Sequence, residues 1–217
     1  MNEHTTDHLE LYTIGHSNHE WSVFAALLRK NSITAIADVR SSPYSRFNPQ
    51  FNRELLERML NEDGVRYVFL GRELGARRDE PECYEGRQAR YEKIAESPLF
   101  LEGIGRLLKG AKENRIALLC AEKDPITCHR MVLVCRTLRR YGLDLIHILD
   151  DGNVESNADA ERRMMSATGV PETDLFQSQD ELLEEAYRQQ GLRIAWVEPE
   201  DEPSDGLAPA RSEDYLE

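Results

Sequence analysis

The residues best suited to chemistry lie between positions 120 and 130. Thiol, carboxylate, imidazole and guanidinium groups all fall within that span: Cys120, Glu122, Cys128, His129 and Arg130. Asp124 followed by Pro125 is typical of a helix start, so the sequence predicts Cys128 in the first turn of a helix. Backbone N–H groups at a helix start stabilise a thiolate, the reactive form of cysteine. We therefore expect Cys128 to be the nucleophile or a thiolate ligand. Cys120 is the second candidate. It ranks below Cys128 because it ends an apolar run and should be buried, which raises the pKa of a thiol.

Groups suited to binding or proton transfer also occur earlier in the chain. They are Gly15, His16, Ser17, Asp38, Arg40 and Ser45. Glu122, His16 and His129 are candidates for acid–base catalysis, since carboxylates and imidazoles can exchange protons near neutral pH. Arg40 and Arg130 have the planar guanidinium that holds a phosphate or carboxylate bidentately. We expect Gly15, Ser17, Asp38 and Ser45 to complete the ligand-binding surface.

Structural roles for the same residues remain open alternatives. Asp38 can cap backbone N–H groups of its own loop, and the arginines can form internal salt bridges with Asp38 or Glu122. A free cysteine is often a small buried apolar residue. Under these alternatives the predicted fold is the same, but the residues have no catalytic or ligand-binding role.

Two familiar kinds of cysteine site fit this pattern poorly. A phosphatase- or rhodanese-type loop holds an oxyanion with backbone N–H groups, whereas Ala-Glu-Lys-Asp-Pro after Cys120 has no glycine and includes a proline without a donor. A zinc site formed by Cys120, Cys128, His129 and His16 has no C-x2-C pair. Adjacent residues 128 and 129 would also project about 100° apart on a helix. We therefore expect no metal, and the sequence names no cofactor.

Alternating strand and helix signals are expected to position these groups. Apolar runs predict strands at residues 9–14, 33–37, 65–70, 116–120 and 143–149. Amphipathic spacing predicts helices between them, the first opened by a capping box of Ser17 and Glu20, and the last running from the Asp124–Pro125 start to Gly142. This order predicts an α/β fold, a mainly parallel sheet with helices on both faces. Ligands bind at the carboxyl ends of such strands. We therefore expect His16, Asp38, Arg40, Glu122 and residues 128–130 to line one crevice.

Three blocks of the chain resemble a known family. They are Thr13-Ile14-Gly15-His16-Ser17, Asp38-Val39-Arg40 with Pro43 and Ser45, and Leu119-Cys120-Ala121-Glu122 with Pro125 and Cys128-His129-Arg130. In this order they resemble the signature blocks of the domain of unknown function 488 family, over residues 11–150. The resemblance implies that the blocks form one site, and it brings no established reaction.

The rest of the chain differs in charge and pattern. Formal net charge is −13, and all of the negative excess lies in residues 150–217. We predict a core domain at 1–150, a helical extension at 151–197 packed on it, and an acidic disordered tail at 198–217. Within the extension, helical spacing at 158–168 precedes a capping box of Ser178 and Glu181, a helix ending at Gly191 and an edge strand at 192–197.

Composition narrows the functional classes. Hydrophobic residues make up 40% of the chain, yet no apolar run reaches the roughly 20 residues that a membrane span needs. We expect a soluble cytoplasmic protein whose four cysteines are reduced. Arginines and tyrosines interleave at residues 72–91, but acidic residues among them nearly cancel the charge, so a nucleic-acid surface is possible but not favoured.

The sequence favours an enzyme acting on an anionic small molecule or nucleotide-like group, a hydrolase or transferase with a Cys/His/Glu site. The alternative is a non-catalytic module that binds a nucleotide or nucleic acid through the same arginines.

Overall fold

The structure, a computed structural model, describes residues 9–199. Its centre is a six-stranded sheet in the order β3-β2-β6-β1-β7-β8. β8 pairs antiparallel with β7, and the other pairs are parallel. The strands are β1 (Glu10–Gly15), β2 (Ala35–Asp38), β3 (Arg66–Phe69), β6 (Ile116–Cys120), β7 (Asp144–Ile148) and β8 (Val154–Ser156). A separate small hairpin joins β4 (Tyr84–Glu85) to β5 (Gln88–Ala89).

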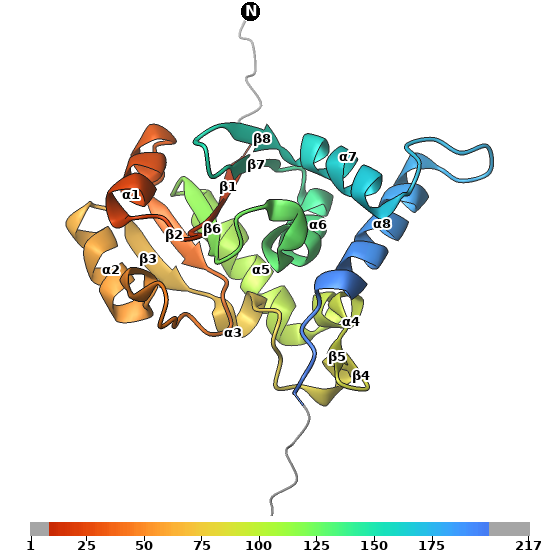
Figure 1. The fold of residues 1–217 in the computed structure, drawn as a ribbon, viewed down its shortest axis with the longest axis horizontal. Helices are drawn as coiled ribbons and strands as arrows, with labels where there is room; N and C mark the ends of the chain where they lie inside the picture. The colour runs from red at the N-terminus through yellow and green to blue at the C-terminus, as the bar shows by residue number, and fades with distance from the viewer. Residues whose placement is uncertain (1–8, 200–217) are drawn as a thin grey trace, which may run out of the picture.

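Helices cover both faces of the sheet (Figure 1). On one face, α1 (Trp21–Lys30) and α2 (Arg53–Glu62) bury Phe24, Leu28 and Leu56 against the strands. The opposite face carries the remaining helices: α3 (Gly71–Leu74), α4 (Tyr91–Glu96), α5 (Pro98–Ala111), α6 (Arg136–Leu138), α7 (Asn157–Thr168) and α8 (Gln179–Ile194). The predicted α/β class, with a mainly parallel sheet, is confirmed.

The central strand β6 explains this layering. All of its residues are buried, and they alternate between the two hydrophobic clusters. Ala117 and Leu119 face α1 and α2, whereas Ile116, Leu118 and Cys120 face the larger helical layer. A strand covered on both faces is apolar throughout, which is why the sequence predicts this strand with its observed bounds.

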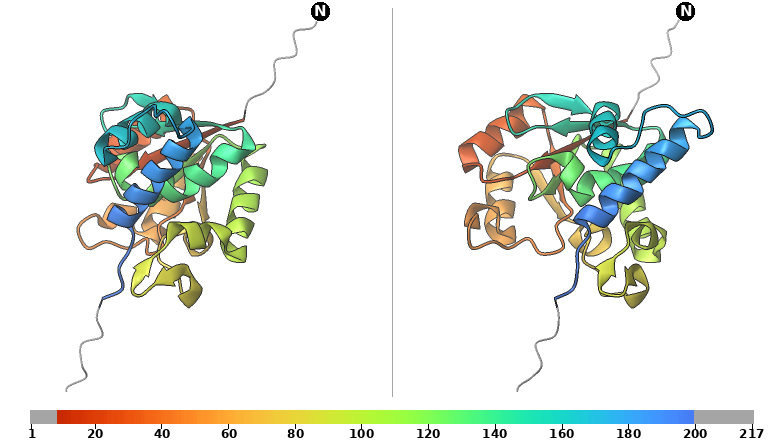
Figure 2. Two further views of the ribbon diagram at one scale, coloured as in Figure 1. Left: turned by 90° about the vertical axis from the view of Figure 1, so that its right-hand side faces the viewer. Right: turned by 45° about the vertical axis from the view of Figure 1, so that its right-hand side comes forward.

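The segment after Asp150 adds the edge strand β8 and the helices α7 and α8. Met164 of α7 and Leu182, Ala186 and Tyr187 of α8 belong to the same hydrophobic cluster as the core. Figure 2 shows α8 running across the outside of this layer. The proposed division at residue 150 stays a prediction, and residues 200–217 of the predicted disordered tail lie outside the described residues.

Several local expectations are wrong. Ser17 does not cap α1, because its φ of 49° turns the chain and the cap residue is Glu20, with no side-chain cap hydrogen bond. The expected helix end at Gly191 is wrong too: α8 continues to Ile194. The predicted edge strand at 192–197 is therefore limited to one bridge between Val197 and Gln88. The capping box of Ser178 and Glu181 is confirmed.

The segment between β3 and α4 contains several short elements. It holds α3, a short 3-10 turn at Pro81–Cys83 and the β4–β5 hairpin. Across residues 9–199, no helix is long and apolar enough to span a membrane.

Candidate functional site

The candidate site lies where three parallel strands end side by side. β6 lies between β2 and β1 in the sheet. The helices α1 and α2, which follow β1 and β2, cover one face, whereas α6, which follows β6, covers the other. A crevice opens where adjacent strands connect to opposite faces. The alignment continues past the strand ends, because the His16 N–H donates to the Cys120 carbonyl at 2.9 Å and the Val39 N–H to the Leu119 carbonyl at 3.1 Å.

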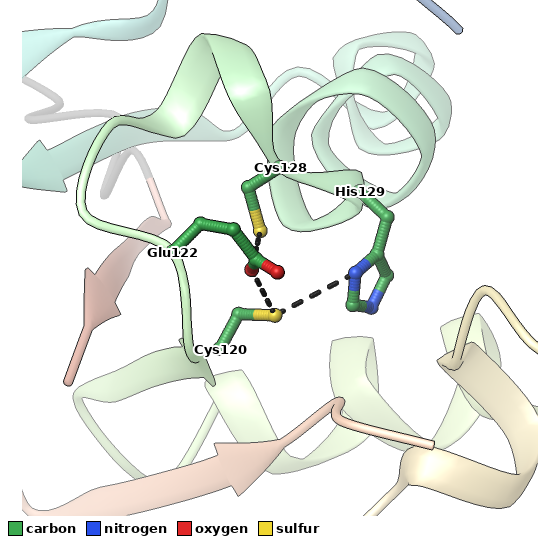
Figure 3. Close-up of side chains that lie close together, drawn as sticks. All are labelled: Cys120, Glu122, Cys128 and His129. Atoms are coloured by element: carbon green, nitrogen blue, oxygen red, sulfur yellow. Dashed lines mark hydrogen bonds between the residues drawn. The ribbon is translucent and has the colours of Figure 1, made fainter. Parts of the chain in front are cut away.

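Four side chains meet at the end of β6 (Figure 3). The candidate ligand atoms of Cys120, Glu122, Cys128 and His129 all lie within 4.8 Å of one another. Oε2 of Glu122 is 2.9 Å from the Cys120 sulfur and 3.0 Å from the Cys128 sulfur. Glu122 belongs to an exposed loop, but its carboxylate turns inward between the two sulfurs. The chain thus brings together all four groups that the sequence analysis placed between residues 120 and 129.

The backbone at Cys128 differs from the expected helix start. Asp124 caps only a short 3-10 turn, Pro125–Thr127, by accepting from the Ile126 N–H. Cys128 then has an extended backbone, with φ −132° and ψ 140°, and a π-helical turn at Arg130–Cys135 follows it. The prediction of Cys128 inside a first helical turn is wrong. So is the argument that residues 128 and 129 project too far apart, since it assumed a helix there.

Cys128 nevertheless occupies a position that favours a thiolate. Its carbonyl accepts the N–H groups of Met131 and Val132, and its sulfur lies 3.4 Å from the Arg130 N–H. Burial alone raises the pKa of the Cys128 thiol, but the contacts with Cys120, Arg130 and His129 outweigh it and hold that pKa well below its ordinary value.

The neighbouring groups shift in the opposite direction. Burial and the adjacent Cys128 raise the pKa of the Cys120 thiol. Burial and the charge of Cys128 also raise the pKa of Glu122. Burial opposes a charge on His129, yet its contact with Cys128 and the charges of Cys128 and Glu122 raise the pKa of its imidazole. A thiolate at Cys128 is therefore surrounded by groups that hold protons.

His129 is oriented by the end of β2. Its Nε2 atom lies 2.9 Å from the Val39 carbonyl oxygen, which can only accept a proton. Nε2 therefore carries the hydrogen of a neutral ring, and Nδ1 faces the Cys120 sulfur at 3.6 Å.

Arg130 lies beneath the cluster and is fully buried. Its Nη1 and Nη2 atoms donate to the carbonyl oxygens of Glu122 and Lys123, at 2.6 and 3.1 Å. Gly15 allows this loop to cross the end of β1, since a Cβ atom there would lie 1.8 Å from the Glu122 carbonyl oxygen. Within residues 9–199, Arg130 forms no salt bridge with a carboxylate, so the nearest counter-charge is the thiolate–carboxylate cluster.

Arg40 has the structural partner that the sequence left as an alternative. Its Nε and Nη2 atoms donate to the two oxygens of Asp38, at 2.9 and 2.6 Å, and Asp38 also accepts from the Tyr67 hydroxyl at 2.8 Å. Burial lowers the pKa of Arg40, but Asp38 raises it overall. Arg40 still lines the cleft above the cluster. Its Nη1 atom forms no hydrogen bond with any other residue of the described chain.

The acid–base candidate His16 and the expected ligand-binding residues Ser17 and Ser45 make local contacts outside the cleft. His16 stacks on Phe51 with centroids 4.4 Å apart, and burial, followed by the charge of Arg40, lowers its pKa to about 4, so the ring is neutral at physiological pH. His16 does not line the cleft above the cluster. Ser17 donates to Asn18, and Ser45 accepts from the N–H groups of residues 47 and 48; neither lines the cleft.

A cleft of about 210 Å³ opens over the cluster. Cys120, Glu122 and His129 line it together with Arg40, whereas Cys128 lies behind Glu122. Tyr91, Arg77, Ile194 and Trp196 also line the cleft. Sequence reasoning missed Ile194 and Trp196, whereas Arg77 and Tyr91 lie in the arginine–tyrosine stretch at residues 72–91 that it did not favour as a binding surface. The Arg77 guanidinium stacks on the Trp196 ring at 3.7 Å. Ser41, Ser42, Arg77 and Trp196 also line an adjoining cavity of about 1000 Å³.

Comparison with known proteins assigns the family. The model of the family described as domain of unknown function DUF488 matches residues 20–137, more than half of the chain. The chain belongs to the DUF488 family. Among curated proteins and solved structures, nothing matches it. The matched span of DUF488 contains the cluster and Arg40, and it ends before β7 and the helices that follow.

A buried chain of hydrogen bonds links Arg130, next to the cluster, to β7, α7 and α8, which lie outside the matched DUF488 span. Arg130 Nε contacts the Thr13 hydroxyl at 3.3 Å, Thr13 contacts His147 at 2.8 Å, and His147 contacts Asn157 at 3.1 Å. Asn157 then donates to Glu161, which also accepts from the Tyr187 hydroxyl. Thr13 and Arg130 belong to the quoted sequence blocks, but no local motif marks His147, Asn157, Glu161 or Tyr187.

Proposed function

We propose that the protein is an enzyme that acts on an anionic small molecule or a nucleotide-like group bound in the cleft above Cys120. One observation carries the proposal: a thiol pair, a carboxylate and an imidazole lie within 4.8 Å of one another, and Cys120, Glu122 and His129 of this cluster line a cleft with arginines in its walls. Perturbed ionisable groups concentrated in one cleft are typical of active sites.

The roles follow from the positions of the groups. Arg77 and the free Nη1 atom of Arg40 bind the anionic group, and the Trp196 ring stacks on a flat moiety such as a base. Glu122 exchanges protons with the substrate, since its raised pKa brings it closer to neutral pH. Cys128 supplies the negative charge of a thiolate. Four free cysteines suit a reducing compartment, so we also propose a cytoplasmic location.

Binding and turnover separate this proposal from the alternative of a pure binding module. Thermal-shift measurements with inorganic phosphate, a nucleoside diphosphate and a dicarboxylate identify which anion the cleft binds. Arg77→Ala should weaken that binding about tenfold or more, because it removes a charged partner. The matched control Arg58→Ala changes an exposed arginine of α2 far from the cleft and should leave binding unchanged.

Glu122→Gln then tests catalysis. For an enzyme, the variant retains binding of the identified anion but loses turnover, measured by NMR on candidate esters or anhydrides of that anion. If wild type binds the anion but converts no such compound, the protein is a binding module and the enzyme proposal fails.

A further inference from the structure

We propose that Cys120, Glu122, Cys128 and His129 together bind one thiophilic divalent cation with the chemistry of Zn²⁺. The inference rests on the proposed function only for the role of the ion, since a cation at the cleft floor would meet the bound anion. The binding itself rests on the geometry of the four side chains.

The four side chains are grouped closely enough to form a tetrahedral ligand set after small adjustments. Zn²⁺ bonds of about 2.0–2.3 Å at tetrahedral angles place ligand atoms about 3.3–3.8 Å apart. The Cys120 sulfur lies 3.6 Å from the His129 Nδ1 atom, and the Glu122 oxygen lies 2.9 and 3.0 Å from the two sulfurs. The ligand atoms span at most 4.8 Å, so shifts of about 0.5–1 Å bring all four to these spacings around one ion.

The surroundings of the cluster orient its atoms as ligands. The Val39 carbonyl accepts the hydrogen of Nε2 of His129, so in the neutral ring that binds a metal the lone pair of Nδ1 points at the Cys120 sulfur. A histidine that ligates a metal usually donates its other N–H to such a carbonyl. The Arg130 N–H points at the Cys128 sulfur, as a donor to a metal-bound thiolate would.

The charges also suit a cation. The thiols of Cys120 and Cys128 both contact the same carboxylate oxygen of Glu122. The three groups cannot all ionise without mutual repulsion unless a positive ion lies among them. The buried Arg130 guanidinium, which has no carboxylate partner in residues 9–199, offsets the excess negative charge of a site with three anionic ligands. Two sulfurs with one nitrogen and one oxygen favour Zn²⁺ over Mg²⁺ or Ca²⁺.

The ion has a path from solvent. Cys120, Glu122 and His129 line the cleft, and Glu122 stands on an exposed loop. The cysteines that take no part, Cys83 and Cys135, are buried elsewhere in the core.

The test is a metal titration of the full chain. The protein is reduced and treated with a chelator, a thiol count of four confirms full reduction, and Zn²⁺ is then titrated in competition with a chromophoric chelator. We expect one Zn²⁺ per chain. Co²⁺ in place of Zn²⁺ should give the thiolate-to-metal charge-transfer band and the intense d–d bands of a tetrahedral site.

Variants locate the bound ion. Cys128→Ser should weaken Zn²⁺ binding at least about 100-fold and abolish the charge-transfer contribution of that sulfur. Glu122→Gln, on an exposed loop where the fold tolerates change, should weaken binding at least about tenfold. Cys83→Ala removes a buried thiol outside the cluster and should retain wild-type affinity. Equal affinity of wild type and Cys128→Ser, or a Co²⁺ spectrum without a thiolate band, would overturn the proposal.

The outcomes for this site and for the proposed function are distinguishable. If chelator-treated protein takes up no added Zn²⁺ but still converts a substrate, the metal site is overturned and the enzyme proposal stands. Stoichiometric Zn²⁺ binding, lost in Cys128→Ser, supports the metal site even when none of the tested anions is converted.

Discussion

The Nη1 atom of Arg130 lies 2.6 Å from the carbonyl oxygen of Glu122. This contact fixes the backbone of the loop after β6 from below, while the Glu122 side chain turns toward the two sulfurs. The same arginine therefore orients a carboxylate without touching it. Loss of Arg130 should disturb the cluster through the loop backbone.

Replacing Arg130 tests this dependence. Arg130→Met leaves two carbonyl groups and the Cys128 sulfur without their buried cation, so we expect the free energy of unfolding to fall by about 3–5 kcal/mol. Urea denaturation followed by circular dichroism measures it. Arg140→Met, at an exposed arginine beyond α6, should change stability by no more than about 0.5 kcal/mol. Similar losses of stability in both variants would contradict a specific stabilising role of Arg130 at the cluster.

Gly15 makes a second prediction. An added Cβ would lie 1.8 Å from the Glu122 carbonyl oxygen, which is backbone and cannot rotate away. We expect Gly15→Ala to lower the free energy of unfolding by about 1–3 kcal/mol through the backbone shift it forces. Gly105→Ala is the matched control, because a Cβ on that residue of α5 meets no atom within 4 Å. In a helix it should add about 0.5–1 kcal/mol, so the two alanines should shift the urea midpoint in opposite directions.

The main strands and their order along the chain could be predicted because each is an apolar run between turn residues. The same reasoning brought Asp38, Arg40 and Glu122 to one sheet edge, since parallel strands end together. It failed at Cys128, where Asp124 and Pro125 form a capped start that lasts for one short turn. Local capping signals carry no information on whether a helix continues. The extended backbone at Cys128 comes instead from the packing that buries this residue.

His147 makes stability depend on pH. Burial, followed by the nearby Arg130 charge, lowers the pKa of His147 from 6.5 to about 3, so the folded protein keeps this ring neutral while the unfolded chain protonates it below about 6.5. The stability is complete above pH 6.5 and is lost as pH falls toward 3, by up to about 1.4 kcal/mol per pH unit. Urea denaturation at intervals between pH 8 and pH 4 measures the slope. His147→Gln should flatten that slope, whereas an unchanged slope would contradict the assignment.

The two thiols of the cluster should differ in reactivity when no metal is bound. The Arg130 N–H and guanidinium favour the Cys128 thiolate, whereas burial and the adjacent Cys128 keep Cys120 protonated. We expect iodoacetamide at about pH 7 to label Cys128 first, with mass spectrometry locating the adduct. Faster labelling of Cys120 would show that its place in the cleft wall matters more than its protonation. Added Zn²⁺ should protect both cysteines, and labelling of Cys83 is the internal control.

The residues that sequence reasoning missed lie far from the motifs along the chain. Trp196 reaches the cleft because α8 continues past Gly191, and the glycine at that point indicated a helix end. Phe51, which stacks on His16, follows a loop with no regular pattern. Contacts of this kind depend on how segments pack together, and neither residue spacing nor capping encodes that.

The hydrogen-bonded chain from Arg130 to Glu161 has a fixed polarity. Asn157 gives its amide hydrogen to Glu161, so its oxygen faces His147 and the ring must carry its proton on Nε2. Nδ1 can then only accept, which makes Thr13 the donor to it and leaves the Thr13 oxygen to accept from Arg130. Every hydrogen points away from the cation and toward the carboxylate. Glu161 of α7 is therefore the negative end of a line of aligned hydrogen-bond dipoles, and Arg130 beside the thiols is its positive end. Reversing the donor and acceptor roles at one residue would require reversing them at every residue of the line.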